Sequence, residues 1–135
     1  MKNSDKRFWL FIVLIFALLI FAKASKAQIT SIPTIEEIKI ELAKQKVKHA
    51  DIVLRQAILE TGWLSCTKCS LKYNNLFGFW YKKQYLKFDN WKESIAYYRR
   101  WQDRHFKGGD YYQFLVDRGY ATDPEYINKL KSINI

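Results

Sequence analysis

The chain has few of the residues from which metal centres are built. It contains two cysteines and two histidines among 135 residues. A zinc-type site needs about four such ligands, so Cys66, Cys69, His49 and His105 would all have to meet at one point. The two histidines are more typical of surface or capping positions. We therefore expect no metal site, and the chain is expected to need no cofactor.

Long basic runs are also absent, although the chain is strongly basic. It carries 23 Lys and Arg against 13 Asp and Glu, a net charge of +10. No run of consecutive basic residues is longer than two, and no nucleic-acid-binding motif is present. We expect no nucleic-acid partner. The charge suits a polyanion outside the membrane, such as a cell wall or an acidic lipid surface, unless it serves solubility alone.

Apolar residues form one long run near the amino end. Basic residues precede fifteen apolar residues at 8–22, a run that is short for a membrane span and typical of a signal peptide. Ser25 and Ala27 provide small residues at the spacing of a signal-peptidase site. We expect a signal peptide at 1–27 and an exported domain at 28–135, in the periplasm or cell envelope. The alternative is an uncleaved N-terminal membrane anchor, because bulky aromatic residues extend the run.

The rest of the chain has the patterns of a mostly helical domain. Residues that cap helix N-termini precede stretches with apolar residues at helical spacing. They predict helix starts at Thr34, at Asp51 with an end near Leu64, at Asn90, at Asp110 with an end at Gly119, and at Asp123–Pro124.

Between the second and third of these helices the sequence predicts a loop and a hairpin. Residues 65–73 are expected to form the loop. Aromatic residues at 78–81 and 85–88 flank a polar turn at 82–84, which is typical of two short strands. No repeat or low-complexity linker is visible. We therefore expect an α+β fold that is mostly α, in a monomer large enough to bury its own core.

Glu60 is the candidate for acid chemistry. It lies near the end of the second predicted helix, where almost all preceding residues are apolar. Such surroundings disfavour a carboxylate, so its pKa should rise toward the range in which it donates a proton at neutral pH. Gly62 would end the helix or admit a ligand, and the Trp63 indole would add an apolar wall. The alternative is an ordinary surface glutamate on an amphipathic helix.

Three segments resemble the signature motifs of the bacterial glucosaminidase family, which includes the hydrolase domain of the flagellar peptidoglycan hydrolase and the Bax-like proteins. They are QAILETGW at 56–63, NNLFG at 74–78 and GYATDPEY at 119–126. They occur in the order expected for the family, and the resemblance extends from about residue 35 to 133. The first segment alone would also fit lytic transglycosylases.

The resemblance implies a lysozyme-like fold that cleaves peptidoglycan glycan strands after N-acetylglucosamine. Glu60 matches the general acid of the family, and Tyr120 matches the tyrosine that helps to stabilise the cationic transition state. Asn75, Phe77 and Gly78 match the turn that forms the groove wall beside the acid. The alternatives are a muramidase or lytic transglycosylase on the same fold, or a peptidoglycan-binding module without activity.

Aromatic residues make up 17% of the chain, and some of them are expected to bind sugar rather than fill the core. We assign Trp63, Tyr98 and Trp101 to substrate binding. The alternative is that such rings are part of the core. Arg104 and the arginines at 99–100 would face either the carboxylates of peptidoglycan stem peptides or solvent.

One departure from the family pattern concerns the second carboxylate. Many members carry an acid in the hairpin region, but no Asp or Glu occurs at 74–88. Glycosidases usually act through two carboxyl groups. Either the acetamido oxygen of the substrate replaces the second group, or Tyr120 or Asp123 orients a water molecule.

The two cysteines are close in sequence. In an exported protein, the expectation for Cys66 and Cys69 is a disulfide, which would hold the turn between the Glu60 helix and the 74–78 turn. A redox motif is less expected, because the pair follows a helix, whereas redox pairs begin a helix after a strand.

Overall fold

Five α-helices and one short hairpin make up the part of the chain that the computed structural model describes, residues 31–135. The predicted leader at 1–27 lies outside the described residues. The α-helices are α2 (Ile35–Lys44), α3 (Ala50–Glu60), α4 (Trp91–His105), α5 (Tyr111–Asp117) and α6 (Tyr126–Ser132); the hairpin is β1 (Trp80–Tyr81) and β2 (Gln84–Tyr85), and η2 (Ser70–Tyr73) is a short 3-10 helix. The predicted α+β fold, mostly α with one small hairpin, is confirmed.

Side-chain caps begin three of the helices at the predicted residues. Thr34 Oγ1 accepts the N–H of Glu37 at 3.2 Å, and the Glu37 carboxylate accepts the Thr34 N–H at 2.8 Å, which completes a capping box. Asn90 Oδ1 and Asp110 Oδ1 each accept the N–H three residues ahead, at 3.2 and 2.8 Å. These caps satisfy backbone donors that the first helical turn leaves without partners.

The predicted start and end of α3 are wrong. The helix begins at Ala50, before Asp51, and its N-cap His49 has left-handed backbone angles (φ 51°) and makes no side-chain cap. It ends at Glu60 because Gly62, Trp63 and Leu64 adopt positive φ values of 54°, 59° and 61° in succession, which no α-helix can accommodate.

The predicted start of α6 and the predicted turn of the hairpin are also wrong, each by a short distance. Asp123 Oδ1 accepts the Glu125 N–H at 2.9 Å, and this turn delays the helix until Tyr126. The hairpin pairs Trp80 with Tyr85, so its turn is the two residues 82–83. Both are lysines with positive φ (48° and 65°), the geometry that suits the twist of a tight hairpin. The segment expected as a loop at 65–73 contains η2.

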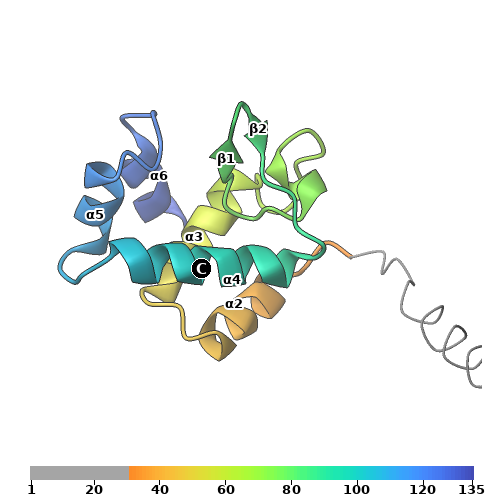
Figure 1. Ribbon diagram of the computed structural model, residues 1–135, viewed down its shortest axis with the longest axis horizontal. Helices are drawn as coiled ribbons and strands as arrows, with labels where there is room; N and C mark the ends of the chain where they lie inside the picture. The colour runs from red at the N-terminus through yellow and green to blue at the C-terminus, as the bar shows by residue number, and fades with distance from the viewer. Residues whose placement is uncertain (1–30) are drawn as a thin grey trace, which may run out of the picture.

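The longest helix, α4, lies across the molecule and carries the hairpin toward one end and the α5–α6 segment toward the other (Figure 1). Its Ile95 and Tyr98 are fully buried, and they share the core with Ile38 and Leu42 of α2 and with Ile58 of α3. Helix α3 packs on both α2 and α6. None of the helices among residues 31–135 is long and apolar enough to cross a membrane.

Candidate active site

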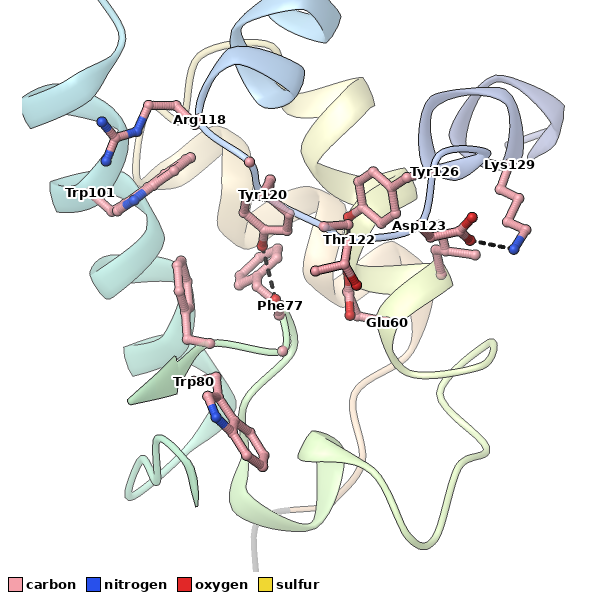
Figure 2. A pocket seen from close by; sticks show the side chains of 15 residues that line it. Glu60, Phe77, Trp80, Trp101, Arg118, Tyr120, Thr122, Asp123, Tyr126 and Lys129 are labelled. Carbon is pink, nitrogen blue, oxygen red and sulfur yellow. Dashed lines mark hydrogen bonds and ion pairs between the residues drawn. The ribbon is translucent and has the colours of Figure 1, made fainter. Parts of the chain in front are cut away.

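A cleft of about 600 Å³ surrounds the end of α3. On one side, which we call the hairpin side, it is lined by residues 77–80. On the other, the helical side, it is lined by residues 118–123, Tyr126 and Lys129. Leu59 of α3 and Trp101 of α4 complete the lining, and Glu60 lies between the two sides (Figure 2). Segments far apart in the sequence therefore meet around one carboxyl group.

Burial raises the pKa of Glu60 above its usual value. A smaller effect opposes the shift, because the Tyr126 hydroxyl donates a hydrogen bond to Glu60 Oε1 at 2.9 Å and so favours the ionised form. The direction of the shift agrees with the expectation from the apolar helix. A carboxyl group of this kind holds its proton closer to neutral pH than a surface glutamate does, as a general acid requires.

The second carboxyl oxygen of Glu60 faces a glycine. A Cβ atom at Gly78 would lie 2.6 Å from Glu60 Oε2, and Gly78 also has a positive φ of 68°. Only glycine fits both the conformation and the close approach. Because Oε1 accepts from Tyr126, the proton of the neutral acid belongs on Oε2. Gly78 therefore leaves room for the oxygen that carries the proton.

A chain of buried hydroxyls and amides, which we call the tyrosine–glutamine chain, leads from the core to Glu60. Its members are buried side chains linked by hydrogen bonds. In order, Gln102 Nε2 donates to Tyr111 (2.8 Å), Tyr111 to Tyr98 (2.7 Å), Tyr98 to Gln56 Oε1 (2.5 Å), Gln56 Nε2 to Tyr126 (3.3 Å) and Tyr126 to Glu60 Oε1 (2.9 Å). The direction is consistent throughout, since each hydroxyl accepts one bond and donates one. The chain fixes the Tyr126 hydroxyl as a donor toward the acid.

The assignment of Tyr98 to substrate binding is wrong. Its side chain is fully buried, and its hydroxyl is engaged within the tyrosine–glutamine chain. Burial raises the pKa of Tyr98 well above its usual value, so the hydroxyl stays protonated as a donor. Tyr98 lies too deep to touch a ligand in the cleft and acts on Glu60 only through Gln56 and Tyr126.

Tyr120 joins the two sides of the cleft. Its hydroxyl donates to the Phe77 carbonyl oxygen at 2.8 Å (Figure 2), and its ring stacks on that of Tyr126 with centroids 5.9 Å apart. Burial raises the pKa of Tyr120 well above its usual value, so this donor also persists at any working pH. The residue thus fixes the distance between the helical side and the hairpin side next to Glu60.

Asn75 belongs to the turn expected to form the groove wall, but it shapes that turn from inside and does not itself line the cleft. The residue is fully buried. Its Nδ2 donates to the Phe79 and Leu86 carbonyl oxygens at 2.9 and 3.1 Å, and its Oδ1 accepts from the Phe77 and Phe79 N–H groups at 3.3 and 3.1 Å. All of its donors are therefore used in holding the backbone that brings Gly78 to Glu60.

Residues 36–134 match the glucosaminidase family, described as mannosyl-glycoprotein endo-beta-N-acetylglucosaminidase. The chain belongs to this family. The resemblance noted in the sequence is confirmed, and the match includes every residue that lines the cleft. Comparison with curated proteins and with solved structures gave no match.

Membership makes this glucosaminidase domain a glycoside hydrolase, an endo-β-N-acetylglucosaminidase that acts on peptidoglycan. Phe77, Gly78 and Trp101, which the sequence assigned to the groove, all line the cleft of the glucosaminidase domain. Trp80, at the start of β1, also lines it and is 57% exposed. An exposed indole in the same cleft as the acid is a surface on which a sugar ring can stack.

Trp63 lies away from the cleft of the glucosaminidase domain, and its assignment to substrate binding is wrong. The left-handed residues after Glu60 turn the chain away from the acid. The Trp63 side chain is 56% exposed and lines a separate groove with residues of α2 and the carboxyl terminus, among them Ile35 and Ile135. The apolar environment of Glu60 therefore comes from other side chains.

Asp123 is the second carboxylate in the cleft lining. It forms an ion pair with Lys129 (Figure 2), and this contact is the main reason that the pKa of Asp123 lies below its usual value. The sequence had already identified Asp123 as a residue that could orient a water molecule. The roles of Tyr126 and Gln56 could not be predicted in this way, although both lie inside the motif segments. No spacing rule shows that Tyr126 bonds Glu60 across 66 residues or that Gln56 bonds Tyr126 across 70.

The expected disulfide between Cys66 and Cys69 is not formed, and both residues are free thiols. The turn directs Cys69 Sγ toward the Cys66 carbonyl oxygen, to which it donates at 3.6 Å. Burial raises the pKa of Cys69, whereas a hydrogen bond from the Cys69 thiol lowers that of Cys66. Within residues 31–135 no group of three His, Cys, Asp or Glu side chains is placed to hold a metal ion.

Proposed function

We propose that this chain is an exported peptidoglycan hydrolase in which Glu60 protonates the glycosidic oxygen on the reducing side of N-acetylglucosamine. The observation that carries the proposal is that the two oxygens of the Glu60 carboxyl group have different surroundings. Oε1 accepts from Tyr126 at 2.9 Å, and Oε2 lies where a Cβ at Gly78 would be 2.6 Å away. A protonated Oε2 at the cleft surface supplies the proton that the leaving sugar needs.

The group that completes the reaction is proposed to belong to the substrate. The carboxylates that line the cleft in the described part of the chain are Glu60 and Asp123, and Lys129 neutralises Asp123. In the first step the acetamido oxygen attacks the anomeric carbon while the glycosidic oxygen leaves with the proton of Glu60. In the second step water attacks the same carbon, and the Glu60 carboxylate takes its proton. The acid is thereby restored and the anomeric configuration is retained.

The alternative within the same cleft uses Asp123 to orient water for direct displacement. Its position on the helical side, across from the hairpin, favours this role, whereas its ion pair with Lys129 weakens it as a base. Direct displacement inverts the anomeric carbon. Proton NMR of the first product therefore separates the two routes: a retained β-anomer supports substrate assistance, and an inverted α-anomer would assign the step to Asp123.

The activity is tested by digesting purified peptidoglycan with the wild type and with Glu60→Gln and analysing the products by mass spectrometry. The wild type should release fragments with a reducing N-acetylglucosamine end. The Glu60→Gln variant, which keeps the shape of the side chain without its acid proton, should lose at least about a hundredfold in rate. Reducing or anhydro-muramic ends, or an unchanged rate in the variant, would overturn the proposal.

Export follows from the leader in the sequence. The basic residues and the apolar run at 8–22 support secretion to the cell envelope, where peptidoglycan lies. If the leader stays attached, the domain remains on the outer face of the membrane. Removal of residues 1–27 leaves a net charge of +6, since they contain five basic residues and one acidic residue. Mass spectrometry of the protein recovered from the envelope distinguishes the cleaved form from the anchored one.

A further inference from the structure

The end of the cleft next to Trp101 carries an arginine, Arg118, that forms no ion pair within residues 31–135. Arg118 follows α5, is exposed and lines the cleft beside Trp101 (Figure 2). Arg104 and Lys107 lie at the end of α4 and are also exposed. We call these three residues, together with the imidazole of His105, the Arg118 cluster. The ring of His105 lies 5.8 Å from that of Trp101, which connects the cluster to the cleft wall.

The acidic residues near the Arg118 cluster in sequence are already engaged elsewhere. None of the ion pairs within residues 31–135 includes a member of the cluster. Asp103 pairs with Arg99 at 2.8 Å, Asp117 accepts from Gln113, and Asp110 caps α5. No carboxylate of the described residues therefore forms an ion pair with the cluster.

The imidazole of His105 reports this excess of positive charge. Its pKa lies below the usual value, first because of desolvation and then because of the charges of Arg118, Arg104 and Lys107. Cations at the end of α4 are favoured by the helix dipole, but that explains Arg104 and not the placement of Arg118 in the cleft lining.

The two ends of the cleft differ in charge. At the end away from Trp101, Lys129 is paired with Asp123, so that end is neutral in sum. Figure 2 shows Arg118 with Trp101 on one side of Glu60 and the Asp123–Lys129 pair on the other. A substrate strand lying across Glu60 would therefore meet unbalanced positive charge at one end only.

We propose that the Arg118 cluster is a binding site for a carboxylate carried by the glycan strand, next to a sugar held against Trp101. The proposal rests on the proposed function and adds that the substrate must be anionic at this position. A guanidinium binds a carboxylate through two parallel hydrogen bonds, which gives both affinity and orientation. In peptidoglycan such a carboxylate lies on the muramic acid residue or on the peptide attached to it. The stem peptide supplies it where the peptide is present, and the lactyl group supplies it after the peptide is removed.

The test measures binding rather than turnover, so that it does not depend on catalysis. Calorimetric titrations of Glu60→Gln protein, with and without Arg118→Gln, would use peptide-bearing muramyl fragments, peptide-free muramyl fragments and neutral N-acetylglucosamine oligomers. Arg118→Gln should weaken binding of the carboxylate-bearing fragments about three- to tenfold and leave the neutral oligomers unaffected. Arg118→Lys should restore part of the loss.

Arg100→Gln is the matched control. Arg100 is an exposed arginine of α4 that lies over the Tyr97 ring and does not line the cleft. It should leave the dissociation constants of all ligands unchanged. A loss confined to peptide-bearing fragments assigns the carboxylate to the stem peptide. A loss confined to peptide-free fragments assigns it to the lactyl group, whose carboxylate is free only there, and a loss with both shows that the site accepts either carboxylate.

Two results would overturn the proposal. One is equal affinity of the parent and Arg118→Gln for carboxylate-bearing fragments, and the other is an equal loss for neutral oligomers. Failure of the proposed function is a separate outcome, since it appears as absence of lysis by the protein that carries Glu60. The binding titrations still answer the question about Arg118 in that case.

Discussion

The helical side of the cleft contributes hydroxyls and charges, whereas the hairpin side contributes backbone and aromatic rings. Tyr126 on the helical side donates to Glu60 Oε1 and thereby affects its pKa. On the hairpin side, Gly78 places no side chain against Oε2, and Asn75 holds the turn in place. The comparison teaches that the acid strength of Glu60 and the access to its proton are controlled by different parts of the chain. Substitutions on the hairpin side should therefore change the position of Glu60, and substitutions on the helical side should change its pKa.

The largest effect is expected on the hairpin side, from Gly78→Ala. The new Cβ would lie 2.6 Å from Glu60 Oε2, so the carboxyl group must move. A displacement of about 1 Å costs about a hundredfold in kcat/KM. The loss should be similar across the pH range, because the substitution displaces the acid and removes no group that hydrogen-bonds to it. Steady-state hydrolysis of peptidoglycan measured from acid to alkaline pH checks it.

Gly119→Ala is the control for backbone strain. Gly119 has a similar positive φ of 60°, but a Cβ there would meet nothing within 4 Å. Both substitutions carry the cost of a left-handed alanine, about 1 kcal/mol, and only one of them crowds the acid. If the two variants lost activity equally, the contact with Oε2 would not be the cause.

The helical side is tested by Tyr126→Phe. Loss of the hydroxyl removes the hydrogen bond that lowers the pKa of Glu60, so this pKa should rise further. A general acid works while it is protonated, and the alkaline limb of the pH–rate profile should move to higher pH. The maximal rate should fall by less than about tenfold, because Glu60 keeps its place. A limb that moved to lower pH would contradict the role given to Tyr126.

Much of the fold follows from local signals, and the exceptions have a common cause. Thr34, Asn90 and Asp110 begin helices through their own side chains, so three residues of sequence suffice to find each start. The start of α3 at His49 depends on a left-handed backbone without a side-chain cap. No local sequence pattern predicts a helix start of this kind.

The site was predictable where chemistry is local and not where it depends on distant packing. Glu60 stands out in the sequence because its helix is mostly apolar, and Gly78 because it ends the polar turn of the second motif. The buried positions of Tyr98 and Asn75 could not be predicted. Only the folded chain shows that Tyr98 bonds Gln56 across 42 residues and that Asn75 bonds the backbone of Leu86. An aromatic stripe on a helix looks the same whether it faces the core or a ligand.

A smaller effect is expected for Tyr120→Phe, which sharpens the comparison because its hydroxyl crosses from one side to the other. The variant loses the bond to the Phe77 carbonyl oxygen and keeps the ring stacked on Tyr126. Loosening the tie should lower kcat/KM a few-fold, about the effect of one hydrogen bond. The alkaline limb should stay where it is, in contrast to Tyr126→Phe. A shift equal to that of Tyr126→Phe would mean that Tyr120 also tunes the acid.

The smallest effect concerns stability, and its sign follows from the raised pKa of Glu60. Between the pKa of the unfolded chain and the higher pKa of the folded state, the folded protein binds more protons, so its stability falls as pH rises through this window. Glu60→Gln removes that dependence and should gain stability relative to the wild type from acid to neutral pH, by about 1.4 kcal/mol for each unit of pKa shift. Asp123 gives the opposite trend, because Lys129 lowers its pKa and Asp123→Asn should lose most stability at neutral pH. Urea unfolding of both variants at pH 4 and pH 7 measures the two slopes; slopes of the same sign would show that burial does not control Glu60.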